Sequence, residues 1–187
     1  MTSTNQWLDD SDSNQLTPVS AVSTTSPTNL GLEPMARKMS EHMNLIFNLC
    51  CQLEHIADQL PDNVDKQDCL LVARSIHPVV KHAHEFEENV LFPVLREKIH
   101  DDQLLEQTLQ RLQGEHLEDE SYAEEVHHGL ISFVSGLSEV SIDSLSYMLR
   151  GFFEGMRRHL AFEREHVLPL LLTIDNTNNA SIKGATA

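Results

Sequence analysis

Apolar residues recur every three or four positions along four long segments of this chain, and that helical period constrains the fold more than any other feature of the sequence. The segments are residues 33–60, 65–99, 101–135 and 141–173. No alternating pattern of the kind typical of strands competes with them. Because only a few residues join consecutive segments, neighbouring helices are expected to run antiparallel. We therefore predict an all-α protein, folded as an up-down-up-down four-helix bundle.

Residues with special backbone preferences mark where these helices are expected to begin and bend. Asp101 is suited to cap the start of the third helix, and Ser141 or Asp143 the start of the fourth. Pro78 lies inside the second segment and should bend it, because proline lacks an N–H group and its ring crowds the preceding turn. The buried stripe predicted for the first helix contains Leu45, Ile46, Leu49, Leu53, Ile56 and Leu60.

The two ends of the chain differ in composition from its middle. Residues 1–32 contain twelve Ser or Thr and little apolar periodicity, so we predict a disordered Ser/Thr-rich arm. Residues 175–187 are small and polar, which predicts a flexible tail. The bundle itself is assigned to residues 33–174. No Lys or Arg precedes Arg37, so we expect neither a signal peptide nor an Arg-rich transit peptide.

The charge balance excludes several classes of partner. Thirteen Lys and Arg face 29 Asp and Glu, a formal net charge of -16, and such a surface repels phosphate backbones and anionic lipids. No apolar run approaches the roughly 20 residues that a membrane-spanning helix needs. The three cysteines are an odd number and do not form a secreted disulfide framework. We therefore expect a cytoplasmic protein that binds neither nucleic acid nor membranes.

Histidines and carboxylates recur in a matched pattern in the two halves of the folded segment. Each half contains one histidine and, after nearly the same interval, a His-x-x-x-Glu motif. The first set is His42, His84 and Glu88, and the second is His116, His159 and Glu163. Residues four apart share one face of a helix, so each motif directs two ligand-type side chains to one place.

These six residues also fall at one level of the predicted bundle. The two single histidines lie in the first halves of helices one and three, and the two motifs lie toward the ends of helices two and four. In an up-down-up-down bundle those positions share one half of the molecule. Buried imidazoles and carboxylates are costly without partners, and two cations would satisfy them together, so we predict a metal site. The alternative is that the histidines are hydrogen-bonded core residues without metal.

The motif order, together with the sequence VLFPVL at residues 90–95, resembles the hemerythrin-like or HHE cation-binding domain family over about 140 residues. The resemblance implies a non-haem di-iron centre inside a four-helix bundle, with an oxo or hydroxo bridge between two irons. It implies Glu88 and Glu163 as bridging carboxylates. It implies four terminal ligands: His42, His84, His116 and His159. Manganese or zinc can occupy similar ligands.

The chain departs from oxygen-carrying hemerythrins in its third helix. Those proteins have His-x-x-x-His there, whereas the second position in this chain is Glu120, which either binds metal or faces solvent within the acidic run 118–120. The second helix reads His84-Glu85-x-x-Glu88, similar to the iron-sensing hemerythrin domain of an F-box ubiquitin-ligase adaptor. Glu85 is therefore either a further ligand or a solvated surface residue. A carboxylate in place of histidine favours ferric iron, which argues against simple oxygen transport.

Three functions are compatible with these features. The leading hypothesis is a di-iron protein that binds or senses oxygen, another small diatomic ligand such as nitric oxide, peroxide, or iron itself. The second is an enzyme, either a di-iron oxidase or a peroxide-consuming enzyme. The third is a metal-free helical interaction module.

Overall fold

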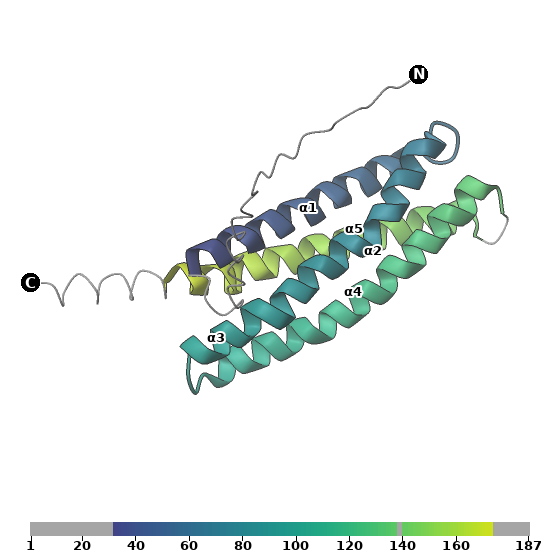
Figure 1. Cartoon of the computed structure of the whole chain (residues 1–187). Coiled ribbons are helices and arrows are strands. Elements are labelled where there is room, and N and C mark those ends of the chain that lie inside the picture. The colour runs from purple at the N-terminus through teal and green to yellow at the C-terminus, as the bar shows by residue number, and fades with distance from the viewer. Residues whose placement is uncertain (1–31, 138–139, 174–187) are drawn as a thin grey trace, which may run out of the picture.

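The computed structural model describes residues 32–137 and 140–173, and every element in these ranges is helical (Figure 1). The elements in chain order are α1 (Leu32–Gln59), α2 (Lys66–Phe86), the π-helical η2 (Glu87–Leu91), α3 (Phe92–Lys98), α4 (Gln103–Ser135) and α5 (Ile142–His166). Because η2 and α3 continue α2, the chain forms four long rods. The predicted all-α four-helix bundle is confirmed.

The predicted ends of the chain lie largely outside the described residues. Of the arm assigned to residues 1–32, only Leu32 is described, and it begins α1 with its side chain buried. The tail assigned to residues 175–187 is wholly outside. Among the described residues, no helix combines the length and apolar character needed to cross a membrane.

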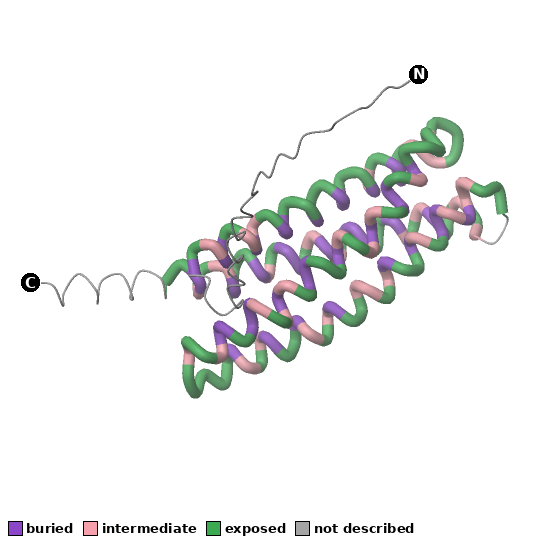
Figure 2. Tube along the Cα trace, in the orientation of Figure 1, coloured by how far each residue is buried: buried purple, intermediate pink, exposed green. Residues whose placement is uncertain are grey.

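Each rod buries one face against its neighbours. α2 packs against α4, α1 packs against α5 and α2, and α4 packs against α5. Buried positions therefore follow the inward side of every rod, as Figure 2 shows. Most of the stripe predicted for α1 is buried, but Leu45 is 53% exposed and the prediction for it is wrong. Leu45 precedes Ile46 by one residue, about 100° around the helix, which turns it away from the two neighbouring rods.

Side-chain caps begin two of the helices close to their expected positions. Ser141 caps α5, as one of two predicted candidates. The cap of α4 is Asp102 and not Asp101, since the Asp102 carboxylate accepts hydrogen bonds from the backbone N–H groups two and three residues later. Asp101 has a φ of 56°, in the left-handed region, which is unsuited to a helix N-cap. Gly136, with a φ of 70°, ends α4 where the sequence indicates.

A π-helical turn interrupts the second rod just before Pro93. The Phe92 N–H donates to the carbonyl of Glu87, five residues back, in place of the four-residue spacing of an α-helix. Proline lacks an N–H, and its ring collides with the carbonyl four residues earlier in a regular α-helix. The wider turn accommodates that ring. By contrast, α2 continues through Pro78 without ending, and the bend predicted there stays a prediction.

Candidate metal centre

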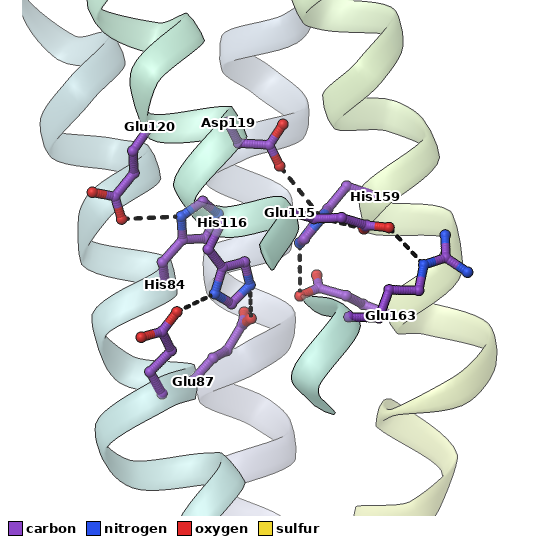
Figure 3. Close-up of polar contacts among 10 residues, drawn as sticks. His84, Glu87, Glu115, His116, Asp119, Glu120, His159 and Glu163 are labelled. Carbon is purple, nitrogen blue, oxygen red and sulfur yellow. Dashed lines mark hydrogen bonds and ion pairs between the residues drawn. The ribbon is translucent and has the colours of Figure 1, made fainter. Parts of the chain in front are cut away.

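Five buried polar side chains from three of the four rods point toward one another in the bundle interior (Figure 3). They are His84 from α2, Glu87 from η2, His116 from α4, and His159 and Glu163 from α5. Each is at most 5% exposed. Imidazoles and carboxylates are rarely buried so completely without a partner that satisfies them.

The five side chains form two overlapping sets of potential metal ligands. The first set is His84, His116 and His159, and the second is Glu87, His116, His159 and Glu163. Within each set, one ligand atom of every residue lies within 4.8 Å of the others. Ligand atoms about 2.1 Å from a common ion are at most about 4.2 Å apart, so only a small contraction would place them around a cation.

Contacts inside the cluster leave several polar atoms without partners. His159 Nε2 lies 3.2 Å from Glu163 Oε1 in a hydrogen bond. His116 Nε2 lies 3.3 Å from Glu87 Oε2, but neither atom has a hydrogen bond with acceptable geometry among the described residues. His84 Nε2 is likewise buried and unpartnered, and its ring stacks on that of His116 at 3.9 Å. A buried unsatisfied group costs about 1–3 kcal/mol, and a cation would satisfy these atoms together. The donor set therefore fits a metal.

The protonation states also suit metal binding. Burial, with the neighbouring charges of His116 and His159, lowers the pKa of His84 to about 2, so this ring is neutral and offers a lone pair. Burial and the charge of Glu163 raise the pKa of Glu87 well above its usual value. Burial opposes ionisation of Glu163 too, but hydrogen bonds from His159 and Glu87 outweigh it and lower the pKa of Glu163. Burial therefore favours the protonated form of Glu87, whose proton a cation can replace, whereas the hydrogen bonds to Glu163 favour its carboxylate form.

The π-helical turn determines which glutamate of the second rod enters the cluster. Glu87, three residues after His84, is 2% exposed and faces the other ligands. Glu88, four residues after His84, has a side chain that is 35% exposed and lies outside both ligand sets. Its Oε1 is 2.7 Å from His116 Nδ1. A uniform α-helical period favoured Glu88, and the signal that could have indicated Glu87 is Pro93 with its effect on the preceding turn.

Three carboxylates of α4 face the outer sides of the histidines. Glu120 Oε1 is 3.3 Å from His84 Nδ1, so this residue, whose side chain is 31% exposed, contacts the cluster instead of only facing solvent. Glu115 Oε2 and Asp119 Oδ2 are 3.3 Å and 3.4 Å from His159 Nδ1. The sequence did not indicate Glu115 or Asp119, because their roles depend on the distance between α4 and α5.

His42, the one predicted ligand from α1, lies outside both ligand sets. Its ring is 2% exposed and lies between His82 and Phe86, with centroid distances of 5.1 Å and 5.2 Å. Neither ring nitrogen has a hydrogen-bond partner among the described residues. Burial, together with the charges of Lys38 and His82, lowers the pKa of His42 to about 4.

The structure thus brings together four of the seven predicted ligands and adds Glu87. The four are His84, His116, His159 and Glu163. Glu85 has a side chain that is 55% exposed, and its carboxylate is 4.0 Å from the ammonium of Lys81, as expected of a solvated surface residue. As metal ligands, His42, Glu85 and Glu88 stay predictions.

The chain matches a model of a known protein family. A family model described as the hemerythrin HHE cation-binding domain matches residues 36–171. This range contains every residue of the cluster and nearly all of the described bundle. No curated protein and no solved structure shows a significant match to the chain.

Proposed function

Because this chain belongs to the hemerythrin HHE cation-binding domain family, we propose that its buried cluster holds a non-haem di-iron centre that binds or senses oxygen, peroxide, nitric oxide or iron. One observation carries the proposal: the buried ligand sets together supply three imidazoles and two carboxylates in one pocket, and each carboxylate has two oxygens with which it can bind two adjacent ions. Family membership supports cation binding as such. The number of ions and their identity are our proposal.

The proposed ligands are the five residues of the cluster: His84, Glu87, His116, His159 and Glu163. Mixed imidazole and carboxylate ligands suit iron, although manganese and zinc accept the same donors. Glu87 and Glu163 are the candidates for bridging carboxylates, because each offers two oxygens and they already interact with each other. Iron bound there would supply redox chemistry toward a small oxidant.

The surrounding residues control charge and access. The cluster is nearly closed to water, and the Phe92 ring stacks near His116 at a centroid distance of 5.9 Å. Glu87 and Glu163 offset cationic charge inside the cluster, and the carboxylates of α4 add further negative charge around it. This balance favours ferric over ferrous iron. It suits a sensor that changes state on oxidation better than a carrier that must release oxygen unchanged.

An optical titration with metal analysis on the same sample tests this function. The full chain is loaded with Fe(II) without oxygen and then exposed to oxygen or peroxide. We expect two irons per chain and near-ultraviolet absorption that bleaches on reduction and returns on oxidation. Consumption of many equivalents of peroxide would indicate an enzyme. Less than one iron per chain after iron-replete expression would contradict the proposal and favour the metal-free interaction module.

A further inference from the structure

Acidic residues in the middle of α4 face histidines that belong to other helices. Glu120 lies toward His84 on α2, whereas Glu115 and Asp119 lie toward His159 on α5 (Figure 3). α4 packs against both α2 and α5, so one helix reaches both rings. None of the three carboxylates belongs to the ligand sets of the cluster.

At His84 the carboxylate lies on the ring nitrogen that faces away from the other ligands. Glu120 Oε1 is 3.3 Å from Nδ1, whereas Nε2 is buried and has no hydrogen-bond partner among the described residues. A neutral imidazole has one N–H and one lone pair. If Glu120 accepts the hydrogen bond from Nδ1–H, the Nε2 lone pair is left for a cation.

His159 also has carboxylates beside Nδ1, but here Nδ1 is the buried ring nitrogen without a hydrogen bond among the described residues. Glu115 Oε2 and Asp119 Oδ2 converge on Nδ1 at 3.3 Å and 3.4 Å. Arg111 orients Glu115, with Nε 2.6 Å from Oε1. The other ring nitrogen, Nε2, is 3.2 Å from Glu163 on the ligand side. Carboxylates therefore face Nδ1 of both histidines, and Nε2 is directed into the cluster or toward a ligand carboxylate.

We propose that Glu120, Asp119 and Glu115 are positioning residues, which hold the Nδ1–H groups of His84 and His159 and direct Nε2 of each ring to the metal. The inference rests on the proposed function, because it assigns roles around the same site. Outer carboxylates of this kind orient metal-bound histidines and make them more basic. Their removal typically weakens metal binding about 10- to 100-fold.

Glu120 gives the sharpest test, because it is a single carboxylate acting on one ring. Glu120→Leu removes the acceptor, whereas Glu120→Gln removes the charge and keeps an acceptor oxygen. Glu118 is exposed on the same helix and lies two residues away, so Glu118→Leu and Glu118→Gln are matched controls for charge and helix propensity.

Nitrogen-15 NMR of the imidazoles in the metal-free full chain reports which nitrogen of His84 carries the proton. An anaerobic Fe(II) titration against a competing chelator reports affinity and stoichiometry.

We expect the wild-type protein to carry the His84 proton on Nδ1. Glu120→Leu should shift it toward Nε2 and weaken Fe(II) binding about 10- to 100-fold at unchanged stoichiometry. Glu120→Gln should lose less Fe(II) affinity than Glu120→Leu. The Glu118 variants should match the wild type in Fe(II) affinity and in the proton position of His84. A loss of Fe(II) affinity at Glu120 but not at Glu118 would separate a positioning role from a general effect of negative charge on α4.

Three results would overturn the inference: a wild-type His84 protonated on Nε2, a Glu120→Leu protein that binds Fe(II) as tightly as Glu118→Leu, or a Glu120→Gln protein that loses one iron per chain. The last result would identify Glu120 as a direct ligand. A wild-type chain that binds no iron would contradict the proposed function instead. The proton position of His84 in the metal-free protein would still decide whether Glu120 holds Nδ1.

Discussion

Glu87 and Glu88 are neighbours of the same residue type, yet they have different environments. Glu87 is almost fully buried and interacts with Glu163, whereas the half-exposed Glu88 contacts the Nδ1 side of His116. Burial and the charge of Glu163 raise the pKa of Glu87, so the metal-free fold favours the protonated form of this carboxyl group. A cation would displace this proton, so the group should serve as a ligand at little cost to the metal-free fold.

Glu87→Gln is therefore expected to weaken iron binding at least tenfold, or about 1.4 kcal/mol, with little change in the melting temperature of the metal-free protein. Glutamine resembles the protonated carboxyl group in shape and hydrogen bonding, but its amide is a poor metal ligand. Iron content and competition titrations measure the first effect, and circular dichroism melts measure the second. Glu88→Gln is the matched control and should lose less iron affinity than Glu87→Gln. The reverse order would support the sequence-based assignment of Glu88 as the bridging carboxylate.

His42 should make the metal-free protein sensitive to acid. Its pKa is lowered to about 4, mainly by burial, so the unfolded chain takes up a proton below about pH 6.5 and the folded chain does so only near pH 4. Stability is therefore lost as the pH falls through this window. We expect His42→Leu to remove on the order of 2 kcal/mol of that loss, measured by urea unfolding at pH 7 and pH 4.

The same variant tests whether His42 binds metal. If His42→Leu keeps its full iron content, the ring is a core residue. If it loses iron at pH 7, the prediction from the family resemblance is supported and the metal draws His42 into the site. A pH dependence identical to that of the wild type would contradict the expected titration.

At the scale of elements, the π-helical turn η2 links a proline to the metal centre. Pro93 cannot donate a backbone hydrogen bond, and the turn before it widens so that Phe92 bonds to Glu87. The same widening sets the direction of the Glu87 side chain. Such turns often lie at functional sites, and in this protein the cause is a residue outside the ligand set.

Pro93→Ala removes the reason for the wider turn. We expect the second rod to relax toward a regular α-helix, to rotate Glu87 out of the cluster, and to bind iron about tenfold more weakly, or about 1.4 kcal/mol. Competition titration measures the affinity, and a structure of the variant shows the turn. Pro78→Ala, in an exposed part of α2, is the control and should leave iron binding unchanged. Equal affinity of both variants would show that η2 does not depend on Pro93.

At the scale of the whole molecule, most buried polar atoms without hydrogen bonds among the described residues lie in the cluster, so the free-energy cost of burying them is concentrated there. Among the described residues, the core outside the cluster is apolar except for His42 and Ser132, whereas the cluster holds several buried nitrogen and oxygen atoms without hydrogen-bond partners. The fold must offset that cost with apolar burial unless a cation is bound. Metal binding should therefore contribute directly to the free energy of unfolding.

Removing metal from the loaded protein is expected to lower its melting temperature by about 10 °C. Free metal at about 1,000 times its dissociation constant adds about 4 kcal/mol, and each kcal/mol shifts a domain of this size by about 2–4 °C. Calorimetry with and without a chelator measures the shift. A chain carrying both His84→Leu and Glu163→Leu is the control and should not respond to the chelator. An unchanged wild-type melt would indicate that any bound metal lies on the surface.

The sequence predicted the four rods and four members of the cluster, because both depend on local periodicity. His84, His159 and Glu163 occupy inward positions of helices whose limits follow from capping residues and from Gly and Pro, so their common level in the bundle could be inferred from chain order alone. His116 follows from the same reasoning on α4. The family assignment rests on these motifs and agrees with the match over residues 36–171.

The tertiary structure decided which other groups reach the site. Glu87 replaces Glu88 in the cluster because of a non-α turn, which a uniform period of 3.6 residues does not anticipate. Glu115 and Asp119 reach His159 because of the spacing between α4 and α5, which no single helix encodes. A helical period determines which residues share a face, whereas the packing of neighbouring helices determines which atoms on those faces meet.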